Sequence, residues 1–137
     1  MAKSKLVGIQ NRYLLSNVWN RIDIDFSFFY LFIYLKKGLP QNILIDFPSA
    51  VSVNSIIFQF QGGFVGKKCI VVGSTVDAPN DYSIDIDTFY PEDINPTQTF
   101  NFEATQPLKR VKIIFEESTD FYGRITVYKL DIIGNIC

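Results

Sequence analysis

Apolar and polar residues alternate in many short segments of this chain, and a period of two is the pattern of half-buried β-strands. The alternation is clearest in five segments: 43–47, 68–73, 84–87, 99–102 and 111–116. Pro48 is expected to end the first of them, because proline has no N–H to donate to a neighbouring strand. The segment 6–21 lacks a regular period and is expected to be irregular, with a short helix around residues 14–19.

Two longer apolar segments change phase partway along. In the segment 51–60 the apolar residues move from odd to even positions after Val53, and in the segment 124–133 they do so after Val127. A slip of one residue in a period of two moves every later side chain to the other face of the sheet. Each of these segments is therefore predicted to contain a β-bulge or to pass from one sheet to another.

Turn residues separate the predicted strands. They occur at Gly62-Gly63, Ala78-Pro79-Asn80-Asp81, Tyr90-Pro91-Glu92-Asp93 and Asn95-Pro96. Several short strands separated by such turns predict an all-β fold, a sandwich or a jelly roll. A length of 137 residues fits one domain, so we expect residues 1–137 to form a single domain.

The most apolar part of the chain is the segment 26–35, which ends in Lys36-Lys37. It is shorter than the ~20 apolar residues that a membrane-spanning helix needs, so no transmembrane segment is expected. Three interpretations remain: a strand buried on both faces, an exposed strand for a partner or a dimer, and contact with a membrane. In the exposed case Phe28, Tyr30 and Tyr34 would form a dimer or ligand surface.

The charged residues and the absence of histidine limit the chemistry of the chain. Without histidine there is no Ser-His-Asp or Cys-His site and no usual general base near neutral pH, so we expect no enzyme. A formal net charge of −1 gives no positive field for a phosphate backbone. The basic pairs Lys67-Lys68 and Lys109-Arg110 are too short for strong nucleic-acid binding, and direct nucleic-acid contact is not expected.

The sequence also offers few residues for metal binding or redox chemistry. Cys69 and Cys137 lack the spacing of a zinc-binding pair, so no zinc site and no cofactor are expected. One cluster of carboxylates offers oxygen ligands for a structural Ca²⁺ ion: Asp77, Asp81, Asp85 and Asp87. The first residues do not form a secretory signal, which favours reduced thiols and a location in the nucleus or cytoplasm.

Several separated blocks of the sequence are typical of one known family. They lie, in order, at residues 59–64, 87–93, 98–100, 115–124 and 128–134. Over residues 38–134 the chain resembles the nuclear-receptor-associated proteins named for the testicular orphan receptor four. That family lies in the discoidin, or coagulation-factor type C, superfamily of galactose-binding-like domains. The resemblance implies an eight-stranded antiparallel jelly-roll β-sandwich. It also implies a non-catalytic protein-interaction module that binds an orphan nuclear receptor and represses its activity.

The chain also departs from the pattern of that superfamily. Secreted discoidin domains join a cysteine near their start to one after the last strand, but here no cysteine precedes Cys69. The acidic, tryptophan-containing loop of the family is replaced by the apolar segment 26–35. The alternative function is therefore a carbohydrate- or lipid-binding module that uses the aromatic residues of this segment. The expected protein partner is a nuclear receptor or another transcription or assembly factor, and the sequence does not indicate an oligomeric state.

The candidate partner-binding residues lie in the predicted turns: Phe64, Tyr90, Glu92, Asp93, Asp120, Tyr122 and Arg124. Each position also has a purely structural interpretation. The glycine pair before Phe64 suits a tight turn, and residues 90–93 suit a simple turn. Arg124 either pairs with Asp120 or Glu117 to fix the turn before the last strand, or it recognises a partner directly.

Overall fold

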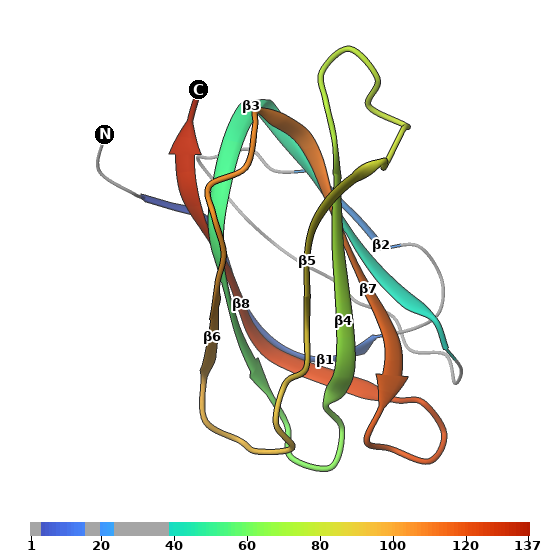
Figure 1. The fold of residues 1–137 in the computed structure, drawn as a ribbon. Helices are drawn as coiled ribbons and strands as arrows, with labels where there is room; N and C mark the ends of the chain where they lie inside the picture. The colour runs from blue at the N-terminus through green and yellow to red at the C-terminus, as the bar shows by residue number, and fades with distance from the viewer. Residues whose placement is uncertain (1–3, 16–19, 24–38) are drawn as a thin grey trace.

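A computed structural model describes residues 4–15, 20–23 and 39–137, and Figure 1 shows the strands of this part of the chain. Its eight strands are β1 (Ser4–Leu15), β2 (Asn20–Asp23), β3 (Gln41–Phe60), β4 (Gly66–Ser74), β5 (Ile84–Phe89), β6 (Gln98–Asn101), β7 (Leu108–Ser118) and β8 (Ile125–Ile136). These ranges contain no helix, and so none that could cross a membrane.

Strand β3 joins the two layers of the sandwich (Figure 1). Its first part pairs with β7 on one side and with β2 on the other, while its second part pairs with β8 and β6. One layer therefore has the order β2-β3-β7-β4-β5 and the other has the order β1-β8-β3-β6. All pairings between the described strands are antiparallel except that of β2 with β3, which is parallel.

Pro48 does not end a strand, contrary to the expectation from the sequence. It is exposed inside the continuous strand β3, where the pairing with β7 shifts register between Asp46 and Val51. Proline is tolerated at such an irregularity because no regular ladder bond is lost there. The residue thus lies where β3 passes from one layer to the other.

Both predicted phase changes are confirmed as β-bulges. The pairing of β3 with β8 shifts register between Val53 and Ser55, which leaves one extra residue, Asn54, in β3. A second shift, between Gln59 and Phe60, leaves Tyr128 as the extra residue of β8. The apolar side chains on either side of each bulge still reach the core, because the extra residue corrects the period.

The prediction for the segment 6–21 is wrong, because β1 runs through most of it and β2 begins at its end. The pairing of β1 with β8 has two register shifts, and a strand interrupted in this way shows no constant period in its sequence. Leu14 and Leu15, the start of the predicted helix, belong to β1. Residues 16–19 and the apolar segment 26–35, with Phe28, Tyr30 and Tyr34, lie outside the described residues.

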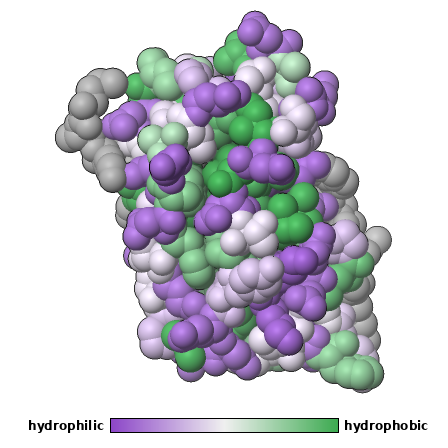
Figure 2. All heavy atoms as spheres, in the orientation of Figure 1, coloured by the Kyte–Doolittle hydropathy of each residue, from purple (hydrophilic) through white to green (hydrophobic). Residues whose placement is uncertain are grey.

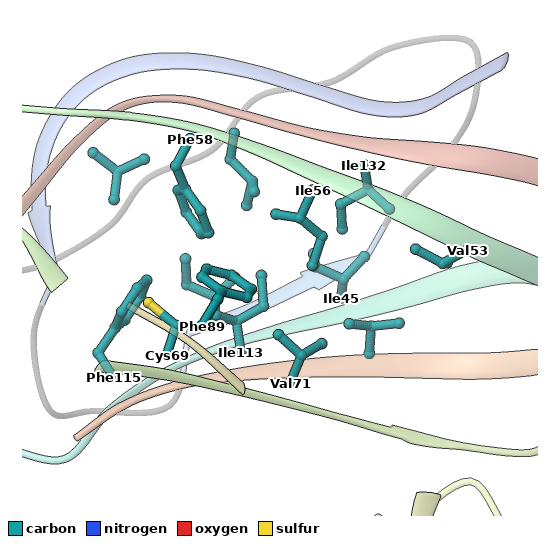
Figure 3. Packing of buried hydrophobic residues seen from close by; sticks show 14 of the residues in the cluster. Ile45, Val53, Ile56, Phe58, Cys69, Val71, Phe89, Ile113, Phe115 and Ile132 are labelled. Carbon is teal, nitrogen blue, oxygen red and sulfur yellow. The ribbon is translucent and has the colours of Figure 1, made fainter. Parts of the chain in front are cut away.

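The core between the two layers contains a cluster of aromatic rings, as Figure 3 shows in part. The ring of Phe58 lies 4.8 Å from that of Phe60, 5.7 Å from that of Phe115 and 6.3 Å from that of Phe89. Cys69 is buried beside them, and burial raises the pKa of its thiol well above its usual value. Cys69 and Cys137 are both free thiols.

Three loops lie together at one end of the sandwich, at the bottom of Figure 1. They connect β3 to β4 (residues 61–65), β5 to β6 (residues 90–97) and β7 to β8 (residues 119–124). We call this surface the loop end. The loop between β4 and β5, residues 75–83, lies at the opposite end with the C-terminus.

Candidate binding surface at the loop end

The three loops of the loop end are joined by hydrogen bonds between residues far apart in the sequence. The backbone N–H of Gly63 donates to Asp93 Oδ1 at 2.7 Å, and that of Gly62 donates to Asn95 Oδ1 at 2.7 Å. Gly63 has a φ of +86°, a conformation that favours glycine. On the other side, the N–H of Thr119, in the loop between β7 and β8, donates to the carbonyl oxygen of Val65 at 3.0 Å. The fold therefore brings all three groups of predicted site residues to one surface.

The loop between β5 and β6 presents one aromatic and one aliphatic side chain. Tyr90 is 65% exposed and Ile94 is 37% exposed. The side chain of Gln98 closes the turn, because it accepts a hydrogen bond from the Glu92 N–H and donates one to the Glu92 carbonyl oxygen. Glu92 and Asp93 are exposed, and the Asp93 carboxylate also accepts the hydrogen bond from the Gly63 N–H of the neighbouring loop.

The carboxylate of Asp120 organises the loop between β7 and β8. It accepts hydrogen bonds from the N–H groups of Tyr122 and Arg124, at 3.1 and 3.0 Å, and from the Arg124 guanidinium, at 2.9 and 3.0 Å. The ion pair with Asp120 that the sequence offered for Arg124 is therefore present. These hydrogen bonds, above all those from the guanidinium, lower the pKa of Asp120 to about 2.

Arg124 also contacts two aromatic rings of the loop end. Its guanidinium carbon lies 5.2 Å from the centroid of the Phe64 ring and 5.4 Å from that of the Tyr122 ring. Both distances suit cation–π contacts, which hold the arginine in one orientation. Phe64 and Arg124 are half-buried, whereas Tyr122 is 52% exposed. The first two residues thus support the surface, and Tyr122 forms part of it.

The candidate residues chosen from the sequence did not include Phe121, which is 94% exposed. Its ring lies 5.2 Å from that of Tyr122 in an edge-to-face arrangement. The available signal was the spacing of Asp120 and Gly123, two turn formers that leave the residues between them on the outside of a turn. In the view of Figure 2, apolar groups project among hydrophilic ones at the lower corners of the molecule, where the loops of Figure 1 lie.

An open groove of about 460 Å³ lies beside Phe121. Leu39 and Phe121 supply apolar groups to it, and Lys67 and Glu117 supply charges of opposite sign. Its walls carry both apolar and charged side chains, so the groove suits contact with a partner surface that also has apolar and polar groups.

The calcium interpretation gains no support from the structure. The four aspartates at positions 77, 81, 85 and 87 are all described, and no group of three or more Asp, Glu, Cys or His residues in the described ranges could hold a metal ion. The carboxylate of Asp87 instead accepts a hydrogen bond from the Thr88 N–H at 2.9 Å.

Replacing Asp120 by asparagine is expected to destabilise the protein by about 2 kcal/mol near neutral pH, because hydrogen bonds to a charged group are lost. The pKa of Asp120 in the folded protein, about 2, lies below its ordinary value of 3.8. Its contribution to stability is therefore present above that ordinary value and is lost as the pH falls toward 2. Urea unfolding of both proteins from about pH 7 to about pH 2 checks this. A difference that stays constant over that range would contradict the role of the ionised carboxylate.

Comparison with solved structures identifies the class of fold. The family 32 carbohydrate-binding module of Clostridium perfringens NanJ, solved with galactose, is similar with a TM-score of 0.57 and 19% identity, over 70% of this chain and 68% of that one. A second module from Clostridium perfringens, solved with GalNAc-β-1,3-galactose, has a TM-score of 0.57 and 18% identity, over 72% of this chain and 68% of that one. The chain therefore has the galactose-binding-like jelly-roll fold.

Sequence comparison then gives the family, although no protein-family model matches the chain. The "Nuclear receptor 2C2-associated protein" of Danio rerio is 45% identical over 98 residues, 72% of this chain and 67% of that protein. The protein of the same name from Homo sapiens is 37% identical over 98 residues, 72% of this chain and 68% of that protein. The chain belongs to the nuclear receptor 2C2-associated protein family.

Proposed function

We propose that this protein is a non-catalytic interaction module that binds a nuclear receptor through its loop end. The observation that carries the proposal is the convergence of three separated loops, with Tyr90 and Tyr122 exposed on one surface. Loops held on a rigid sandwich are common binding surfaces. The names of the relatives supply the class of partner, because they describe proteins associated with nuclear receptor 2C2.

A binding role rather than catalysis agrees with the chemistry of the chain. The sequence has no histidine, and the strongly lowered carboxyl pKa of Asp120 arises from groups of its own loop. The similar solved structures are binding modules as well. We place the protein in the nucleus or cytoplasm, where a receptor partner would be met, and repression of the receptor is the expected consequence of binding.

The proposal is tested by measuring the affinity of the full chain for purified nuclear receptor 2C2 from Danio rerio by calorimetry. The double variant Tyr90→Ala, Tyr122→Ala should bind at least about tenfold more weakly, because exposed aromatic residues dominate binding energies. Val76→Ala is the matched control, since Val76 is 56% exposed in the loop at the opposite end. Equal affinities of the wild type and the double variant would remove the loop end from the proposal.

Carbohydrate binding is the second candidate function, favoured by one observation. The similar modules were solved with galactose and with GalNAc-β-1,3-galactose, and exposed aromatic rings such as Tyr90 and Tyr122 offer apolar faces to a sugar. Titration of the protein with these two sugars distinguishes the candidates. Saturable binding that is lost in the double tyrosine variant would favour this function over receptor binding.

A further inference from the structure

Phe121 has a combination of properties that a structural role does not explain. It is 94% exposed, more than any other large apolar residue of the segment 39–137. Its one described ring contact is with Tyr122, which is itself half exposed. Single exposed apolar residues are common on protein surfaces, so exposure alone decides nothing. What distinguishes Phe121 is that hydrogen bonds fix the loop that carries it.

The loop that carries Phe121 is fixed from several sides. The Asp120 carboxylate receives the hydrogen bonds described above, and the Ser118 hydroxyl donates to the carbonyl oxygen of Arg124 at 2.6 Å. Gly123 has a φ of +75°, and its carbonyl oxygen accepts a hydrogen bond from the side chain of Gln41, a fully buried residue of β3. An exposed aromatic residue on a fixed loop loses little conformational entropy when it binds.

Among the residues that the structure describes, the charges around the loop end are predominantly negative. The loop end and the adjoining ends of β4 and β7 carry five carboxylates and three cations: Glu92, Asp93, Glu116, Glu117 and Asp120 against Lys67, Lys68 and Arg124. Two of the cations are already paired, Lys68 with Glu116 at 3.1 Å and Arg124 with Asp120 at 2.9 Å. This balance opposes an anionic membrane or a nucleic acid and favours a basic partner surface.

From these observations we infer that Phe121 is the anchor of the loop end, and that it inserts into an apolar pocket of a folded protein partner with a basic rim. The inference rests on the proposed function and names the chemistry of that partner. The groove beside Phe121, with Leu39 and Glu117 on its walls, receives the rim of the pocket. Arg124 and Asp120 act through Phe121 as positioning residues, whereas Phe121 itself makes the contact.

The experiment compares the affinities of the full-length wild type and Phe121→Ala for purified nuclear receptor 2C2 from Danio rerio. Loss of a central aromatic anchor should weaken binding by about 30-fold or more. Phe121→Ala should unfold at the wild-type temperature, because the removed ring is almost wholly exposed. Glu117→Lys should weaken binding and reduce its dependence on salt, since it removes one attraction to the basic rim.

A photo-crosslinking residue, p-benzoylphenylalanine, in place of Phe121 gives a second readout. It should form a covalent bond to the receptor, while the same residue at Val76 should not. A wild type that binds, with Phe121→Ala within twofold of it and no cross-link from position 121, would overturn the anchor and leave the proposed function standing. A wild type that does not bind the receptor would overturn both. Binding to phosphatidylcholine–phosphatidylserine vesicles that depends on Phe121 would contradict the inference of a protein partner and indicate a membrane instead.

Discussion

Phe58→Ala is expected to destabilise the protein by about 4 kcal/mol, the largest effect of any substitution proposed here. The Phe58 side chain is fully buried, and its ring contacts those of Phe60, Phe89 and Phe115. These neighbours come from both layers of the sandwich, so a cavity at this point removes contacts that hold the layers together. The measurement is the free energy of unfolding in urea, compared with that of the wild type.

Phe121→Ala is the matched control for this experiment, because it makes the same chemical change at a residue that is 94% exposed. It should change the free energy of unfolding by no more than about 0.5 kcal/mol. If Phe58→Ala does not fold, the milder Phe58→Leu should retain the fold with a smaller loss, because a leucine fills most of the space. Equal effects at positions 58 and 121 would contradict the described core.

The second large effect is expected for Gly134→Ala, at about 3 kcal/mol. A Cβ atom at Gly134 would lie 2.0 Å from the carbonyl oxygen of Ser52, which belongs to the backbone of β3. Gly134 pairs with Val53 next to the bulge at Asn54, so β3 and β8 would have to separate to accept the methyl group. Thermal unfolding should show a midpoint lowered by roughly 10 °C.

Gly63→Ala is the control for the glycine experiment. No atom lies within 4 Å of a Cβ built at Gly63, so the only cost arises from its positive φ of +86°. A conformational cost of this kind is about 1 kcal/mol. A larger loss at Gly63 than at Gly134 would contradict the close approach of β8 to Ser52.

Much of the fold could be predicted, because the order of apolar residues along the chain shows both the period of two of the strands and the positions of the bulges. The shift of phase after Val53 follows from the extra residue Asn54, and the one after Val127 follows from the extra residue Tyr128. The passage of β3 through Pro48 could not be predicted in this way, since it depends on pairing with β7 that is distant in the sequence. Strand β1 could not be predicted either, because its pairing with the distant strand β8 is irregular and leaves no constant period in the sequence.

The candidate site was predictable in its parts but not in its organisation. Turn-forming residues indicated where the three loops lie, and the sequence offered the ion pair of Asp120 with Arg124. The hydrogen bond from Gly63 to Asp93 joins loops that are 30 residues apart, so no local pattern reveals it. The exposure of Phe121 depends in turn on the hydrogen bonds that Asp120 makes to its own loop.

The loop end is the surface that we propose binds a nuclear receptor. Amide hydrogen exchange of the full chain, measured with and without purified nuclear receptor 2C2 from Danio rerio, tests it most directly. Receptor binding at the loop end should slow exchange in residues 61–65, 90–97 and 119–124, and it should leave exchange unchanged in the loop 75–83 at the opposite end. Protection confined to residues 75–83, or no protection anywhere at saturating receptor, would contradict it.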